Sequence, residues 1–582
     1  MIVAFLVELA VESQAGMPND HGVILLVTVG LALVAASAAL VLTRRVSLRI
    51  SIFGTLLIPG ALLAHSTITH VGIYGLVRLA ATISGAVGFA GFFTWVGGFR
   101  WGRVFLFSGA TVALVIALSS LRIPAAKVST AGVPNAHIDV VFIVMDTTRK
   151  DHLSIYGYSK PTSPYLEKFA VHSQVYDDAW SVSPWTPPSH ASMLTGLLPS
   201  EHGADGQVQP RLDDSLVTLQ EVLSENQYAT AGFVANPNLW VEGWDQGFAV
   251  YEGTVIQGSH SVIRLVNAAL FHSRDGWDFE QGTPVIFSKA RNWWSSHENQ
   301  SRFLFLNLMD PHRPYKPPPE MHLRFPLGMA VEKALEIDQD PVTYHIKPGV
   351  PPREAAALAA LYDGEIASMD RHVGLFVDWL SDRGEMDSTL IIVTADHGER
   401  LGERGLVGHD LVMDSYLLEV PLLIRLPGKL LPGRIGHRVQ LDGLPGYVLE
   451  ILGISSPAEM ARRSFRGGDV DLVVAQYQKP EWFIDRLLAR NQSFDVGNYR
   501  ADWNFVSDGR FAFLAPSQDP DRGILIDMAS DRDWAEDVSS RYPDVAEKLR
   551  QTSASLPAFR EITETPVDEN MKRRLRSLGY VD

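Results

Sequence analysis

Carboxylate, hydroxyl and imidazole side chains occur in the chain in patterns that could bind a divalent cation and support nucleophilic catalysis. Asp146 directly follows the apolar run VVFIVM, and Asp396 and His397 follow the run LIIVT after a single alanine. Carboxylates directly after a buried strand suit a hard cation, and a neighbouring imidazole extends the range of metals that such a site could bind. Taken alone, Asp146 is equally well explained as a helix N-cap, and Asp396-His397 as an ordinary polar turn.

Thr186 is a candidate for the nucleophile. It lies in the segment SPWTPPSHASMLTG, where two prolines and a run that can be helical follow it. Threonine before proline is a common helix start, and this structural explanation is sufficient by itself. The same geometry would place the hydroxyl in a positive field that favours its alkoxide, and a bound metal would lower its pKa further. Thr186 is therefore a candidate for both nucleophile and metal ligand.

Histidines complete the set of candidate catalytic residues. His190 lies in the same segment as Thr186, His312 lies in the proline-rich stretch MDPHRPYKPPPE, and His409 follows His397 after a glycine-rich loop. Taken alone, His312 fits a solvent-facing residue of a rigid turn. Taken together, the segments are stronger evidence for one active site, because each follows a predicted strand or begins a predicted helix.

The apolar runs predict a scaffold that would bring these segments to one place. The predicted strands are Ile138–Met145, Ala229–Val234, Phe303–Leu308, Leu390–Thr394 and Val420–Ile424, and the predicted helices are Ser215–Asn226, Pro352–Ser381 and Leu441–Leu452. This alternation is typical of an α/β fold with a mainly parallel sheet sandwiched by helices. Ligands of such sheets bind at the carboxyl ends of the strands, so we expect the candidate residues at that edge.

Other regions follow different patterns. After about residue 456 the alternation ends, and Trp503–Met528 predicts a small antiparallel piece within a C-terminal subdomain, 456–582. The small and polar residues of 125–137 indicate a linker between a region 1–124 and a catalytic domain 138–455.

Residues 1–124 predict a transmembrane bundle of about four helices. The apolar stretches are Gly22–Thr43, Ile50–Ala64, one within Val71–Phe99, and Val104–Leu121. A membrane-spanning helix needs about 20 apolar residues, although buried helices of a soluble core are the alternative explanation. Arginines at 44, 45, 49, 100 and 103 predict cytoplasmic loops. We therefore expect a multi-pass cell-membrane protein with the lipid bilayer as a partner and an extracytoplasmic catalytic domain.

Composition excludes several classes of function. The 582 residues include 50 basic and 66 acidic side chains, for a net charge of −16. This acidic surplus argues against a nucleic-acid partner, whose binding needs Lys and Arg to neutralise phosphates. The chain has no cysteine, which excludes disulfides, zinc-thiolate sites and a cysteine nucleophile.

The order of the motifs resembles the sulfatase family of the alkaline phosphatase superfamily. The resemblance extends from about Asp139 to the C-terminus through DTTRKDHLSIYGY, WTPPSHASMLTGLLPSEHG, LQEVLSENQYATAGF, DPHRPYKPP, LYDGEIASMD, TADHGERLGE, VPLLIRLPG and LRSLGYVD. It implies the fold of that superfamily and one divalent cation, with Asp146, Thr186, Asp396 and His397 as ligands. It also implies that Thr186 is the nucleophile and that His312 and His409 contact the transferred group or protonate the leaving oxygen.

Departures from the family pattern bear on the substrate. Sulfatases use a formylglycine made from Cys or Ser in a C/S-x-P-S-R motif, whereas the aligned stretch here is Thr186 to His190, TPPSH. We therefore expect no formylglycine. Thr147 stands where sulfatases have a second metal aspartate, and their G-K-W-H stretch, which would fall near Ala235 and Pro237, is absent. A threonine nucleophile is similar to that of phosphonate and phosphodiester hydrolases and of membrane phosphoethanolamine and glycerophosphate transferases.

The sequence thus predicts a metal-dependent hydrolase or transferase that acts on phosphate or phosphonate esters through Thr186. The substrate is expected to be a small-molecule, lipid or glycan ester. Mn²⁺ is the favoured cation, with Zn²⁺, Mg²⁺ and Ca²⁺ as alternatives. Two other functions stay open: a sulfuric ester hydrolase acting on a sulfated substrate, and a non-catalytic envelope protein that retains the fold.

Overall fold

The computed structural model describes residues 138–205, 211–241, 243–253, 282–347, 349–465, 470–531 and 536–560. They belong to Val133–Asp582, the second of two units into which the chain divides. The predicted membrane region 1–124 and linker 125–137 lie outside the described residues.

The expected membrane localisation requires correction. Within the described ranges, every helix is too short or too polar to cross a membrane. The 31-residue helix α14, Pro352–Asp382, has the length, but acidic and basic residues recur along it. This finding overturns the sequence-based localisation to a cell membrane and leaves the N-terminal helix bundle without structural support.

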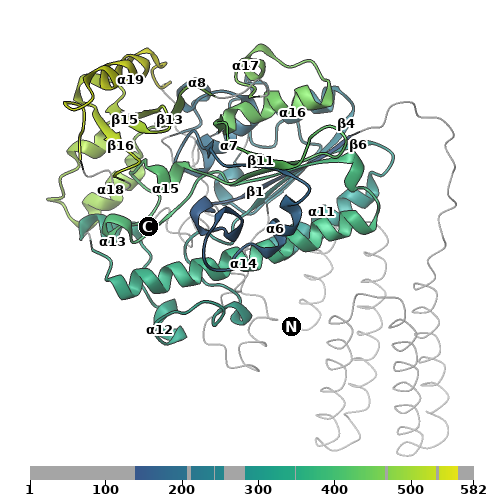
Figure 1. Ribbon diagram of the computed structural model, residues 1–582, viewed down its shortest axis with the longest axis horizontal. Coiled ribbons are helices and arrows are strands. Elements are labelled where there is room, and N and C mark those ends of the chain that lie inside the picture. Colours follow the sequence, from purple (N-terminus) through teal and green to yellow (C-terminus); the bar gives the residue numbers. More distant parts are fainter. Residues whose placement is uncertain are drawn as a thin grey trace, which may run out of the picture. The chain divides into compact units, whose positions relative to one another are not determined.

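An eight-stranded sheet forms the centre of the described region (Figure 1), in the order β11-β2-β10-β7-β1-β6-β4-β5. Its strands are β1 (Asp139–Met145), β2 (Gln174–Tyr176), β4 (Tyr228–Val234), β5 (Val250–Gly253), β6 (Ser301–Leu308), β7 (Thr389–Thr394), β10 (Leu422–Arg425) and β11 (Gly433–Ile435). β7, β1, β6, β4 and β5 pair in parallel, and β10 is antiparallel to both of its neighbours. The predicted α/β class and mainly parallel sheet are therefore confirmed.

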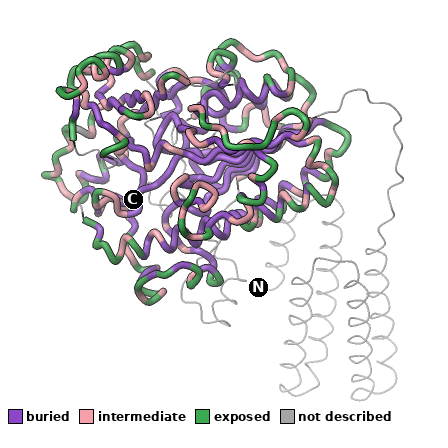
Figure 2. Tube along the Cα trace, viewed as in Figure 1, coloured by how far each residue is buried: buried purple, intermediate pink, exposed green. Residues whose placement is uncertain are grey.

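Each face of the sheet is covered by helices, which explains why the central strands β1, β6 and β7 are buried along their whole length. One core contains Val141 and Ile143 of β1 with residues of α6 (Pro164–Ala170), α11 (Thr283–Ser296) and α14. The other contains Val140 and Phe142 with residues of α7 (Thr186–Thr195), α9 (Leu219–Glu225) and α16 (Leu444–Leu452). Figure 1 shows these two helical layers, and Figure 2 shows the buried strands between them.

The predicted helices are present with small differences at their starts. α9 begins at Leu219 rather than Ser215 because Thr218 and Glu221 form a reciprocal capping box. α16 begins at Leu444 because Leu441–Gly443 forms a short 3₁₀ turn first. The predicted end of α14 at Ser381 is one residue before its observed end.

A four-stranded antiparallel sheet forms the C-terminal region. It consists of β13 (Val473–Tyr477), β14 (Trp503–Ser507), β15 (Phe511–Pro516) and β16 (Ile524–Asp527). Helix α19 (Pro543–Ser555) packs on one side through Leu549. On the other side, Trp180 and Trp185 join residues of this sheet in one apolar cluster. Trp185 directly precedes Thr186, so this packing supports the start of α7.

Shorter elements connect these layers. They are β3 (Ala179–Trp180), α8 (Pro199–His202), α12 (Val331–Leu335), α13 (Pro341–Ile346), β8 (Arg400–Leu401), β9 (Val407–Gly408), α15 (Ser415–Leu418), β12 (Val439–Gln440), α17 (Ala458–Ala461) and α18 (Glu481–Arg490).

Candidate active site

The strand register brings the candidate residues to one edge of the central sheet. On β1, Met145 pairs with Leu308 of β6, and Val144 pairs with Thr394 of β7. Because these strands are parallel, the residues after their carboxyl ends lie side by side. Asp146 follows β1, and the pair Asp396-His397 follows β7.

Three of the predicted metal ligands form a buried cluster. Asp146, Asp396 and His397 each offer one ligand atom, and these atoms lie within 4.8 Å of one another. The Nδ1–H of His397 donates to the carbonyl oxygen of Gly398 at 2.8 Å, which leaves Nε2 as the ligand atom. Oδ1 of Asp396 accepts from the backbone N–H groups of Thr147 at 3.0 Å and His397 at 2.9 Å.

The chemistry of this cluster fits a divalent cation. Oδ1 of Asp146 is buried and has no hydrogen-bond partner in the described part of the chain. Burial raises the pKa of Asp146 to about 7, and the nearby Asp396 carboxylate contributes to the rise. Burial also raises the pKa of Asp396 to about 7. Two buried carboxylates this close are costly as anions unless a positive charge neutralises them, and a cation would do so.

Thr186 is the first residue of α7 and lies next to this cluster. Its Oγ1 is 3.4 Å from Nε2 of His397. Trp185 before it is extended, and Pro187 and Pro188 occupy the first turn, as the sequence predicts. The helix dipole favours negative charge at this position, so the local structure supports an alkoxide on Oγ1.

Two asparagines that the sequence analysis missed connect the nucleophile to the cluster. The side-chain amide of Asn236 donates to Oδ2 of Asp146 at 2.9 Å and to Oγ1 of Thr186 at 3.1 Å. The amide of Asn307 donates to the same Asp146 oxygen at 3.1 Å. Asn236 comes two residues after β4 and Asn307 is near the end of β6. Polar residues at strand ends were the signal that could have found them.

The predicted catalytic histidines lie in two different environments. Nδ1 of His190 donates to the carbonyl oxygen of Thr186 at 2.9 Å, and its Nε2 is 3.3 Å from the amide nitrogen of Asn307. With both nitrogens engaged, His190 is placed to orient its neighbours. His409 is buried, and neither of its ring nitrogens has a hydrogen-bond partner among the described residues. Its ring lies 4.6 Å from that of His397 and 5.5 Å from that of His312, measured between centroids.

The protonation of His312 and His409 bears on their predicted roles. Burial lowers the pKa of each imidazole well below its ordinary value, so both are neutral at pH 7. Nδ1–H of His312 donates to the carbonyl oxygen of Arg313 at 2.6 Å. Neither neutral imidazole fits protonation of the leaving oxygen. His409 can donate its one ring N–H to the transferred group, whereas His312 has used its N–H and can only accept there.

Buried or partly buried acids form ion pairs with Arg149 and Arg313, the two arginines closest in sequence to the candidate ligands and histidines. Arg313 contacts Asp410 at 3.1 Å and Glu399 at 3.6 Å. Arg149 forms ion pairs with Asp151 and Glu403. These pairs tie together the loops that carry His312, His409 and His397.

We expect Asn236→Ala to lower kcat/KM by roughly 10- to 100-fold, because the variant loses the amide that orients both Asp146 and Thr186. Steady-state kinetics at saturating metal measures this loss. Asn238→Ala is the matched control, since Asn238 is buried two residues away and its side-chain amide forms no hydrogen bond with either residue. Equal activity of the Asn236 variant and the wild type would contradict this role.

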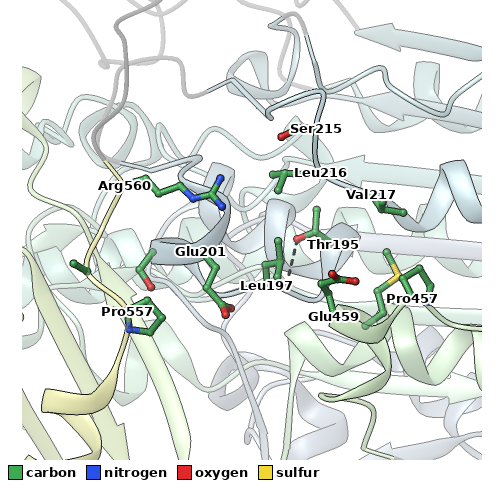
Figure 3. A pocket seen from close by; sticks show the side chains of 13 residues that line it. Thr195, Leu197, Glu201, Ser215, Leu216, Val217, Pro457, Glu459, Pro557 and Arg560 are labelled. Carbon is green, nitrogen blue, oxygen red and sulfur yellow. Dashed lines mark hydrogen bonds between the residues drawn. The ribbon is translucent and has the colours of Figure 1, made fainter.

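A cavity of about 410 Å³ lies at the other end of α7. Figure 3 shows its lining, with Thr195, Leu197, Glu201 and Arg560 among the labelled residues. The dashed line there is the hydrogen bond from the backbone N–H of Leu197 to Oγ1 of Thr195, 3.3 Å long. Since α7 rises about 1.5 Å per residue, this cavity is more than roughly 10 Å from Thr186 and separate from the metal cluster.

Comparison with known proteins defines the family. The sulfatase family model matches residues 138–454. A sulfatase from Formosa agariphila is 23% identical, over 66% of this chain and 82% of its own. Arylsulfatase K from Bos taurus is 22% identical, over 77% of this chain and 88% of its own. The solved structure of a phosphonate monoester hydrolase from Silicibacter pomeroyi has a TM-score of 0.57 at 18% identity, covering 72% of this chain and 94% of that chain.

The family match supports an ester hydrolase rather than a non-catalytic protein. The chain belongs to the sulfatase family. This family generally uses a metal ion, and in the described region the cluster of Asp146, Asp396 and His397 is a candidate site for one.

Proposed function

We propose that the chain is a metal-dependent hydrolase or transferase of phosphate or phosphonate esters, with Thr186 as nucleophile. The observation that supports this most directly is the position of Thr186 Oγ1 beside His397 and Asn236, in a chain without cysteine. A formylglycine hydrate expels sulfate by collapsing to the aldehyde. Threonine has a single hydroxyl and cannot collapse in this way, so the modified Thr186 must be released by external attack.

The reaction begins with the in-line attack of Thr186 Oγ1 on phosphorus. The bond from phosphorus to the leaving oxygen breaks. Oγ1 gives up its proton to water as it attacks, and the leaving oxygen takes a proton from water. Asn236 orients Oγ1, and neutral His409 donates its one ring N–H to an oxygen of the transferred group. The Nδ1–H of His312 already donates to the carbonyl oxygen of Arg313, so His312 contacts the reacting groups as a hydrogen-bond acceptor. Water or an acceptor alcohol then attacks phosphorus, which releases the group and restores the Thr186 hydroxyl.

The cation would be held by Asp146, Asp396, His397 and Oγ1 of Thr186. When bound, it supplies Lewis-acid stabilisation of a phosphoryl oxygen and lowers the pKa of the nucleophile. Oxygen and imidazole ligands together suit Mn²⁺ best in this proposal, with Zn²⁺, Mg²⁺ and Ca²⁺ as alternatives.

The groups around Oγ1 favour an ester with a single negative charge. Hydrogen bonds join Oγ1 to the amide of Asn236, the imidazole of His397 and the carboxylate of Asp396, and none of these partners is a Lys or Arg. Arg149 and Arg313 are each paired with buried or partly buried acids. A phosphodiester or a phosphonate monoester, each with one charge, therefore suits this site better than a doubly charged phosphate monoester.

A covalent adduct on Thr186 tests the proposal. The wild type is mixed with an aryl phosphonate monoester and Mn²⁺, quenched in acid within one turnover, digested and examined by mass spectrometry. We expect the phosphonyl group on the peptide that contains Thr186, and no adduct in Thr186→Ala. Rapid turnover with the adduct on a different residue would refute the assignment of the nucleophile.

Sulfate ester hydrolysis without formylglycine is the second candidate. The curated relatives from Formosa agariphila and Bos taurus, both named as sulfatases, favour it. A sulfate monoester also carries one charge, so charge does not separate the two candidates. They differ in how a sulfated or phosphorylated Thr186 would be released, because a cation that neutralises phosphoryl oxygens assists external attack on phosphorus.

A further inference from the structure

Helix α14 carries buried polar residues that the reaction above does not use. Tyr362, Asp363, Glu365 and Asp370 belong to the motif LYDGEIASMD, and each is at most 1% exposed. Asp370 accepts hydrogen bonds from two backbone N–H groups at the start of α6. Glu365 accepts one from the backbone N–H of Lys316, in the loop that follows His312. These side chains fasten neighbouring loops to the helix.

Tyr362 reaches the turn that follows the predicted ligand Asp146. Its phenol donates a hydrogen bond to the carbonyl oxygen of Thr147 at 2.6 Å. The phenol oxygen of Tyr362 also accepts a hydrogen bond from the backbone N–H of Arg149 at 2.8 Å. One side chain therefore holds the backbone on both sides of Thr148.

Thr147 has a conformation that its residue type disfavours. Its φ of 55° lies in the left-handed region, where a β-branched residue is strained and persists only if its surroundings impose the conformation. In this conformation the backbone N–H of Thr147 points to Oδ1 of Asp396, at 3.0 Å. Thr147 thus links both carboxylates of the cluster, since it follows Asp146 in the chain and donates to Asp396.

We propose that Tyr362 is a positioning residue of the metal site. By holding Thr147 in its left-handed conformation, the phenol sets the separation of Asp146 and Asp396 and so raises the affinity for a divalent cation. This inference rests on the proposed metal site, and it assigns a role in that site to the LYDGEIASMD motif.

The test measures Mn²⁺ binding by isothermal titration calorimetry on the purified full-length chain after treatment with a chelator. Tyr362→Phe keeps the ring and removes the hydroxyl. We expect its dissociation constant for Mn²⁺ to rise about 10-fold or more. We expect kcat at saturating Mn²⁺ to change much less than the affinity.

Tyr156→Phe is the matched control. The phenol of Tyr156 also donates to and accepts from backbone groups, both of Leu422, at 3.3 and 3.0 Å, and it contacts no ligand of the cluster. We expect a loss of thermal stability in both variants and a loss of Mn²⁺ affinity only in Tyr362→Phe. Equal Mn²⁺ affinity in the two variants would overturn the inference, whereas a wild type that binds no divalent cation would overturn the proposed metal site itself.

A second variant tests whether Tyr362 acts by holding Thr147 in its left-handed conformation. Glycine adopts positive φ without strain, so Thr147→Gly should keep the turn without help from the phenol. In that background we expect the loss of Mn²⁺ affinity on Tyr362→Phe to be at least threefold smaller than in the wild type. The same loss in both backgrounds would contradict an action of Tyr362 through Thr147.

Discussion

Replacing Thr186 by alanine is expected to lower kcat/KM by about 10⁴-fold or more, because the variant lacks the oxygen that forms the covalent intermediate. The measurement is steady-state turnover of an aryl phosphonate monoester with saturating Mn²⁺. Thr186 is 1% exposed and packs at the start of α7. The loss of activity caused by the missing hydroxyl must therefore be distinguished from a loss of activity caused by misfolding.

Thr186→Ser provides that distinction, because serine keeps a hydroxyl at the first position of α7. We expect measurable turnover in the serine variant and a covalent adduct at the same position. Circular dichroism of the alanine variant should match that of the wild type. Activity of the alanine variant within tenfold of the wild type would show that another residue is the nucleophile.

The double variant Asp396→Ala/His397→Ala is expected to lose the bound cation and nearly all activity. It removes two of the three clustered ligands and leaves Asp146 alone as a buried carboxylate. Elemental analysis of the purified protein measures metal per chain, and turnover is measured in parallel. Chelation of the wild type should abolish turnover reversibly, with recovery when Mn²⁺ is added back.

Asp139→Ala is the control for this variant. Asp139 is buried and forms an ion pair with Arg302. It begins β1, whereas Asp146 follows the other end of the same strand, roughly 20 Å away. Its replacement should lower stability and leave the metal content unchanged. Full metal content in the double variant would refute the assignment of the ligands.

The sequence predicts much of the scaffold because the physical signals are local. Strands buried on both faces are continuously apolar, so β1 and β7 stand out in the sequence, and the parallel arrangement implies that Asp146 and Asp396 meet at one edge. Proline after Thr186 likewise marks the start of α7. The starts of α9 and α16 were less predictable, because a capping box and a 3₁₀ turn decide them.

The tertiary contacts of the site were not predictable in the same way. Asn236 and Asn307 are ordinary residues in the sequence, and their contacts with Asp146 arise because β6 ends beside β1 and β4 ends beside β6. The two hydrogen-bond partners of His190 come from its own helix and from β6, so its positioning role depends on the folded chain. The contact of Tyr362 with Thr147 joins residues 215 positions apart.

The measurement that tests the central claim most directly is a comparison of substrates with the same aryl leaving group. Aryl phosphonate monoester, phosphodiester, phosphate monoester and sulfate ester are compared by kcat/KM with wild type and Mn²⁺, and Thr186→Ala corrects for background. The account predicts that the singly charged phosphorus esters exceed the sulfate ester by at least tenfold, about 1.4 kcal/mol in the barrier. A tenfold preference for the sulfate ester would contradict the account and make the chain a sulfatase that works without formylglycine.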